Sequence, residues 1–294
     1  MHDHNHHDAA ATHHVDFESP RMVAHAELEG EVFGGLTMQA VGVLAQKHAA
    51  GGGAVRRLLD LGSGPGIGTC VLAERFASAH VVAVDGSAAM LARVAERAER
   101  LGLASRVETR QVELADDLAA LGQADVVWAS LALHHIGDEA AALRGIHGCL
   151  RPGGLLALVE IGEPLRLEGR DAHLGRPGLW ERLDTASVAW FADMRAGLPG
   201  TTASTDYPTM LGATGFEVLV DELLTFVLDP PLDAQARQLA RRHLEQTRAR
   251  LANHAAQPDL DALDELLDAD SEHSITGRDD IAMRISRRLF IARA

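Results

Sequence analysis

The stretch that decides the fold is a glycine-rich run, Leu58-Leu59-Asp60-Leu61-Gly62-Ser63-Gly64-Pro65-Gly66. Its apolar start, residues 58–61, predicts a buried strand, and residues 67–76 after it predict a helix. Glycines between a strand and a helix allow a tight turn and a close approach of the backbone to a ligand, at the helix N-terminus. The run therefore predicts a ligand-binding loop at the first strand–helix turn of an α/β domain.

The segments that follow continue this alternation. Further strands are predicted over residues 81–84, 107–112, 125–129 and 155–161, and helices over 88–101 and 139–150. Strands that alternate with helices at this spacing predict right-handed βαβ units on a parallel sheet. The core is thus predicted to be a doubly wound α/β domain.

The rest of the chain frames this core. We predict a disordered His-rich tail over 1–20, N-terminal helices over 21–53, the core over 54–163, a lid or acceptor insertion over 164–208, and the end of the core over 209–294 with a helical insertion over 229–280. The insertion 164–208 has an irregular pattern and carries four of the eleven aromatic residues, which favours a lid over a pocket. Its Trp180 and Trp190 either form an aromatic cage or anchor the lid on the core. The helical insertion either covers the acceptor pocket or forms the surface of a homodimer.

The charge balance bears on the partners of the protein. The chain has 294 residues with 27 Lys and Arg against 42 Asp and Glu, a net charge of −15. Because nucleic-acid binding depends on cationic side chains that displace counterions from phosphates, we expect no nucleic-acid partner. Two cysteines, no apolar run of about 20 residues and no secretory signal predict a cytoplasmic protein with no membrane partner. No metal site is predicted, since the histidines of the tail lack a fixed geometry and no other cluster has ligand spacing.

Two ligand classes use a glycine-rich loop of this kind. A dinucleotide fingerprint requires glycine at the first, third and sixth positions. Counted from Gly62, the sixth position is Ile67, and counted from Gly64 it is Thr69, so the fingerprint fails in both registers. The carboxylate of Asp60 would repel a pyrophosphate and would favour a ligand that carries an amino group and a sulfonium.

The run 58–66 resembles the first motif of the class I S-adenosylmethionine-dependent methyltransferases. The segments 82–87, 124–130 and 150–154 resemble further landmarks of this family in the right order, and the resemblance covers about residues 30–163. It implies a Rossmann-like, doubly wound sheet of seven strands that is mostly parallel, with the last strand antiparallel. It also implies S-adenosyl-L-methionine as the cofactor.

The same resemblance assigns the cofactor-binding residues. The methionine end would be held by Asp60, Gly62, Ser63, Gly64 and Gly66. The ribose would be bound by Asp85, with Gly86 beside it. The adenine would contact Met90 and Leu114, and the predicted set is completed by Glu113 and Ser130. Asp116 rivals Glu113 as the acid after the third strand.

Two histidines follow the fourth strand, where ligands of such folds bind. In a methyltransferase, His134 or His135 would accept the proton that an oxygen or nitrogen nucleophile loses. The alternative is that both histidines hold the loop by bonding backbone groups, and that proximity alone drives the transfer.

We therefore predict an enzyme that transfers a methyl group from S-adenosylmethionine to a small organic acceptor, at oxygen, by in-line displacement. Two alternatives stay open. One is an NAD(P)-dependent oxidoreductase on the same fold. The other is a non-catalytic regulatory protein that binds the cofactor and whose acceptor pocket is filled by Trp128 or by the lid.

Overall fold

The computed structural model describes residues 18–114, 118–169, 176–196 and 206–294. Residues 1–17 of the predicted His-rich tail and Asp116 lie outside the described residues. The predicted end of the tail at residue 20 was wrong, because Ser19 caps the first helix and Pro20 begins it. Among those described, no helix combines the length and the apolar character that crossing a membrane requires.

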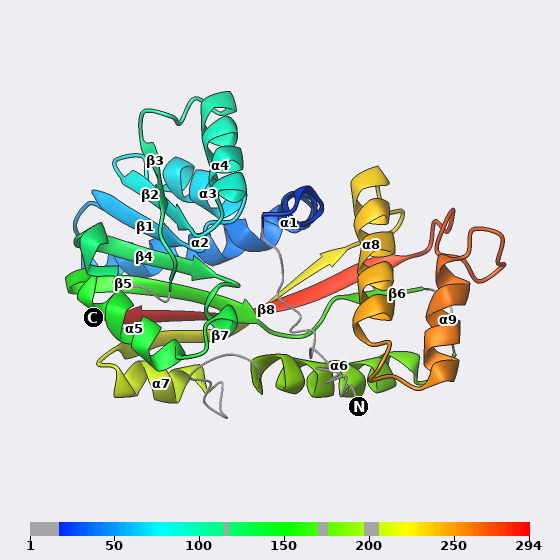
Figure 1. The fold of residues 1–294 in the computed structure, drawn as a ribbon. Helices are drawn as coiled ribbons and strands as arrows, with labels where there is room; N and C mark the ends of the chain where they lie inside the picture. The colour runs from blue at the N-terminus through cyan, green and yellow to red at the C-terminus, as the bar shows by residue number, and fades with distance from the viewer. Residues whose placement is uncertain (1–17, 115–117, 170–175, 197–205) are drawn as a thin grey trace, which may run out of the picture.

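A mostly parallel sheet forms the centre of the molecule (Figure 1). Five parallel strands follow the order β3 (Val107–Gln111), β2 (His80–Asp85), β1 (Arg57–Leu61), β4 (Ala124–Ser130) and β5 (Leu150–Ile161). Strand β8 (Ala282–Arg293) runs antiparallel to β5, and β7 (Glu217–Leu228) pairs antiparallel with β8. This arrangement confirms the predicted doubly wound, Rossmann-like fold with an antiparallel last strand.

The described sheet has eight strands, where seven were predicted. The additional strand, β6 (Arg166–Glu168), pairs with the start of β8 beyond the point where β5 ends. A strand of three residues is too short to show a periodic pattern, which is why the sequence gives no sign of it.

Helices cover both faces of the sheet. On one face, α2 (Gly34–Gly51) and α3 (Ile67–Arg75) pack with β1, β4 and β5 in one apolar cluster; on the other, α5 (Glu139–Gly148) and α7 (Tyr207–Ala213) pack in a second. Helix α4 (Ala88–Arg100) begins where the Ser87 side chain accepts a hydrogen bond from the Met90 amide, a normal N-cap. These helices fix the carboxyl ends of β1, β2, β4 and β5 along one edge.

A helical lobe lies beyond that edge and has an apolar core of its own. It combines α1 (Pro20–Val32), α6 (Leu179–Ala196), α8 (Ala234–Arg250) and α9 (Gln257–Leu267) with β6 and the first half of β8. Within the predicted insertion 164–208, residues 179–196 form an 18-residue helix, so the insertion is less irregular than its pattern indicated. Its buried Leu179, Leu183 and Ala186 recur at helical spacing, but the surrounding prolines obscured that signal.

Helix α1 connects the helical lobe to the core. Glu27 and Glu31 of α1 pair with Arg93 and Arg97 of α4, at 3.0 and 2.8 Å. A Cβ on Gly30 would lie 2.8 Å from Cδ1 of Ile67, so α1 packs closely on the first turn of α3. The helix therefore packs beside the glycine-rich loop, on the first residue of the helix that follows it.

Candidate functional site

The glycine-rich loop requires its glycines for backbone reasons. Gly62, Gly64 and Gly66 have φ values of +68°, +51° and +85°, which side chains disfavour. A Cβ on Gly62 would lie 2.5 Å from Cβ of Ala132, and one on Gly66 would lie 2.9 Å from Cα of Val94. The loop is thus a tight turn that lies against the segment after β4.

A buried hydroxyl in this loop has no hydrogen-bond partner among the described residues. It is Oγ of Ser63, whose residue is 8 % exposed. A buried polar atom without a partner is costly unless a ligand or water bonds to it. Together with the glycine turn, it fits the polar methionine end of S-adenosylmethionine.

Asp60 lies beneath this loop. Its carboxylate is 2 % exposed and accepts a hydrogen bond of 2.5 Å from the Thr69 hydroxyl in the first turn of α3. Burial raises the pKa of Asp60 to about 7, although the Thr69 hydrogen bond lowers it. The side chain therefore stands ready to ionise when a cation approaches the loop.

Asp85 connects the end of β2 to the loop. Its two carboxylate oxygens accept hydrogen bonds from the amides of Gly64, at 2.8 Å, and Ser87, at 2.9 Å. Burial is the largest influence on the pKa of Asp85 and raises it, and the amide hydrogen bonds oppose that rise. A half-buried carboxylate here can accept further bonds from ligand hydroxyls.

The other predicted cofactor residues lie around the same turn. A Cβ on Gly86 would lie 2.5 Å from the carboxylate of Glu113. The exposed Glu113 side chain therefore lies over the Gly86 backbone. A Cβ on Gly62, which would clash with Ala132, would also lie 3.5 Å from Cδ1 of Leu114. Met90 is buried in α4, and Ser130 ends β4. The structure thus gathers the predicted set at one edge of the sheet.

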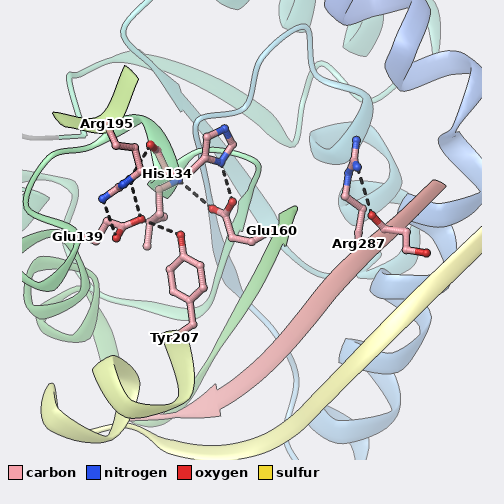
Figure 2. A network of polar contacts seen from close by, with 8 residues as sticks. His134, Glu139, Glu160, Arg195, Tyr207 and Arg287 are labelled. Atoms are coloured by element: carbon pink, nitrogen blue, oxygen red, sulfur yellow. Dashed lines mark hydrogen bonds and ion pairs between the residues drawn. The ribbon is translucent and has the colours of Figure 1, made fainter. Parts of the chain in front are cut away.

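His134 lies in the short 3-10 helix η2 (Leu133–His135) that follows β4. Its Nδ1 lies 2.7 Å from Oε2 of Glu160, and Oε1 of Glu160 accepts a 3.1 Å hydrogen bond from the Leu133 amide. An ionised carboxylate only accepts hydrogen bonds, so in the neutral imidazole that pairs with it Nδ1 carries the proton and Nε2 has the lone pair. Figure 2 shows the second ring nitrogen pointing away from Glu160.

His135 differs from its neighbour. Its side chain is exposed, and the two imidazole rings have centroids 4.1 Å apart. Partial desolvation, together with the neighbouring His134 and Arg195, lowers the pKa of His135 to about 4. His135 therefore holds a proton weakly at neutral pH.

A second polar network fixes the same loop from the helical lobe. Arg195 of α6 donates to the backbone carbonyl of His134 at 2.9 Å and pairs with Glu139 at 3.2 and 3.3 Å. The Tyr207 hydroxyl also donates to Glu139, at 2.9 Å (Figure 2). Burial raises the pKa of Glu139, while Tyr207 and Arg195 oppose that rise.

The aromatic residues of the predicted lid have separate positions. Trp180 and Trp190 pack against the apolar core of the helical lobe, and the Arg250 guanidinium lies 5.0 Å from the Trp190 ring. This packing matches the anchoring role and not an aromatic cage. Phe191 is the aromatic residue of α6 near the site, with its ring 6.3 Å from that of His134.

Sequence reasoning missed Glu160, Glu139 and Arg195. Glu160 could have been found, because it is an acid at the end of an otherwise apolar strand, 155–161. Glu139 looks like an ordinary first-turn acid of α5, and Arg195 like any polar residue of a lid. Their pairing is visible only in three dimensions.

Comparison with known proteins agrees with this architecture. Residues 58–154 match the family model of the methyltransferase domain. Malonyl-[acyl-carrier protein] O-methyltransferase from Dechloromonas aromatica is 41% identical over 105 residues, 36% of each chain. Trans-aconitate 2-methyltransferase from Azoarcus sp. is 36% identical over 149 residues, 47% of this chain and 55% of that protein. The chain thus matches about half or less of the length of these relatives.

A solved structure shares the fold. The YcgJ protein from Bacillus subtilis superposes with a TM-score of 0.51 at 17% identity, over 87% of this chain and 97% of that one. The family match identifies residues 58–154 as a methyltransferase domain, as the resemblance to the class I S-adenosylmethionine-dependent methyltransferases predicted, and the shared fold agrees with it. S-adenosylmethionine is the cofactor of that family.

Proposed function

We propose that the protein transfers the methyl group of S-adenosylmethionine to a hydroxyl oxygen of a small organic acceptor, with His134 as the proton acceptor. The observation that carries this proposal is the His134–Glu160 pair. It lies on the loop whose Ala132 packs directly on Gly62 of the glycine-rich turn.

In this proposal the cofactor lies across the carboxyl ends of β1, β2 and β4. The backbone of the glycine-rich turn and the Ser63 hydroxyl bind the methionine end, and the buried charge of Asp60 stabilises the cationic groups. Asp85 accepts hydrogen bonds from the ribose hydroxyls. Met90 and Leu114 pack on the adenine, and Glu113 lies at the rim beside Gly86.

The bound cofactor supplies a methyl carbon already activated by its sulfonium. The residues of the protein then have two tasks, which are alignment of the acceptor and removal of its proton. Nε2 of His134 accepts the proton, and Glu160 orients the ring and stabilises the imidazolium that forms. His135, with a pKa of about 4, is the weaker acceptor.

The acceptor class follows from the need for a base. A carboxylate acceptor is already ionised at neutral pH and needs no proton acceptor, whereas a hydroxyl must lose its proton. An oriented His–Glu pair therefore favours a hydroxyl. The D. aromatica relative is named as a malonyl-[acyl-carrier protein] O-methyltransferase, which supports oxygen as the target atom. A malonyl group offers a carboxylate oxygen, so the choice of a hydroxyl here rests on the His134–Glu160 pair alone.

The two alternatives have less support. The family match is to methyltransferases, and no glycine stands at the sixth position of the turn for a nicotinamide dinucleotide. Trp128 does not fill the acceptor space, because it is 1 % exposed and its Nε1 lies beneath Gly68 of α3.

Calorimetry and a transfer assay test the proposal. We expect heat of binding with S-adenosylmethionine and none with NAD. Methyl-labelled S-adenosylmethionine is then offered with panels of hydroxyl, carboxylate and amine acceptors, and labelled product is separated by chromatography. Transfer to hydroxyls supports the proposal. Transfer only to carboxylates contradicts the role of His134 as a base, and transfer only to amines contradicts a hydroxyl as the acceptor.

A further inference from the structure

The loop that carries His134 has an unfavourable backbone. Leu131, directly after β4, has φ of +55° and is the one non-glycine residue with positive φ among the described residues. Such a conformation persists only where the surrounding structure holds it. The contacts that hold residues 131–135 therefore decide where the imidazole of His134 points.

One set of contacts comes from the core. The Leu131 amide donates to the Val159 carbonyl at 2.8 Å, and Glu160 accepts from the Leu133 amide and the His134 ring. Both acceptors belong to β5, the neighbour of β4 in the sheet. This side fixes the start of the loop and one nitrogen of the ring.

The other contact comes from the helical lobe. Arg195 of α6 donates a hydrogen bond to the His134 carbonyl, and the same guanidinium pairs with the Glu139 carboxylate. Arg195 is 5 % exposed and Glu139 is fully buried, so this is no surface pair. Burying two charges is favourable only when geometry and further bonds are good, and the Tyr207 hydroxyl supplies one such bond.

We infer that Arg195 is a positioning residue for His134, through which the docking of α6 sets the direction of the proton acceptor. This inference rests on the proposed function. Glu160 fixes the ring from the core, and Arg195 fixes the backbone of the same residue from the helical lobe (Figure 2). Proton removal is then efficient only while the C-terminal turn of α6 is docked on the loop.

The test uses the full chain and a matched control on the same helix. Arg195→Gln removes the bond to the His134 carbonyl and the ion pair to Glu139. Arg182→Gln breaks an ion pair between the exposed guanidinium of another α6 arginine and the buried Asp259, at 2.8 Å, and leaves the loop untouched. Because Arg195→Gln leaves the Glu139 carboxylate buried alone, a double variant with Glu139→Gln is made beside it.

The first readout needs no acceptor. Proton NMR detects the Nδ1 proton of His134, which its bond to Glu160 shields from exchange with water. We expect the signal in the wild type and in Arg182→Gln, faster exchange in Arg195→Gln and in the double variant, and partial recovery in Arg195→Lys. No signal in the wild type, or unchanged exchange in Arg195→Gln and the double variant, overturns the inference.

The second readout is turnover with the hydroxyl acceptor that gives product in the transfer assay. Misplacing a reacting group by about 1 Å costs about 100-fold, so we expect kcat of Arg195→Gln to fall about 10- to 100-fold. KM for S-adenosylmethionine and the kcat of Arg182→Gln should stay within about twofold. Equal kcat losses in the two variants would overturn the inference while leaving the proposed function intact. No transfer by the wild type would contradict the proposed function, and the NMR readout would still decide the role of Arg195.

Discussion

Gly62 faces Ala132 so closely that a Cβ on Gly62 would lie 2.5 Å from Cβ of Ala132. The contact joins the turn after β1 to the loop after β4, which are neighbouring strands of the sheet. It explains how the glycine-rich loop and the candidate base become one site, although Gly62 and His134 are 72 residues apart in the sequence.

The first prediction follows from that contact. Gly62→Ala places a side chain at a φ of +68° and against Ala132, so the strain of the backbone adds to overpacking. We expect the free energy of unfolding to fall by about 2–4 kcal/mol. Gly64→Ala, at φ of +51° with open space around it, should cost about 1–2 kcal/mol. Denaturant unfolding measures both, and equal losses would contradict the role of the Ala132 contact.

A second prediction concerns the pH dependence of stability through Asp60. Burial raises its pKa to about 7 in the folded protein, from 3.8. The folded state therefore binds more protons than the unfolded state between these values, and this group makes the free energy of unfolding decrease as pH rises from about 4 to 7. Asp60→Asn removes this loss of stability with rising pH, and the side-chain oxygen of the Asn can still accept the hydrogen bond from Thr69. We expect Asp60→Asn to be more stable than the wild type at pH 8, by about 2–4 kcal/mol, and equally stable near pH 4.

The same substitution, Asp60→Asn, should weaken the binding of the cofactor. If the buried charge of Asp60 stabilises the cationic end of S-adenosylmethionine, Asp60→Asn binds it less tightly although the protein is more stable. Calorimetry at pH 8 compares the two affinities. Unchanged affinity would show that Asp60 serves the turn of the loop and not the ligand.

A third prediction concerns the ribose. Asp85→Ala removes the acceptor for the Gly64 and Ser87 amides and for the ligand hydroxyls. We expect affinity for S-adenosylhomocysteine to fall by about 1.5–3 kcal/mol for each charge-assisted bond lost. The control is Asp221→Ala on β7, which breaks an exposed ion pair with Arg288. A loss of equal size in the control would count against the assignment of Asp85.

The sequence predicted the core well because its signals are local. The glycines at 62, 64 and 66 have positive φ. The strands at 58–61 and 81–84 are buried on both faces, so their sequences are apolar throughout except for Asp60. Each of these features depends on residues adjacent in the chain. The predicted cofactor residues, apart from Asp116 outside the described residues, therefore gather as expected around one edge.

The contacts of the helical lobe could not be predicted in the same way. Arg195 meets His134 and Glu139 across 61 and 56 positions of sequence. One sequence does not reveal which of many arginines and carboxylates will pair at such separations. The arginines of α8 are a similar case: Arg248 pairs with Asp264 of α9 at 2.8 Å, an exposed pair that joins the two helices.

The last prediction separates the two histidines. His134 is oriented by Glu160 at 2.7 Å and keeps a lone pair on Nε2, whereas the pKa of about 4 of the exposed His135 makes it a poor proton acceptor. Because a positioned base contributes about 10²- to 10⁴-fold, we expect His134→Ala to lower the rate of methyl transfer to a hydroxyl by that range. The rate of His135→Ala should stay within about threefold of the wild-type rate. The rate of Glu160→Gln should lie between the rates of the two histidine variants, because Gln can still accept the hydrogen bond from the Leu133 amide but cannot stabilise an imidazolium. Single-turnover transfer at saturating S-adenosylmethionine measures the rates, with affinity for S-adenosylhomocysteine as the control for an intact cofactor site. Equal losses in His134→Ala and His135→Ala would point to a shared role in holding the loop, and no loss in either would mean that alignment alone carries the reaction.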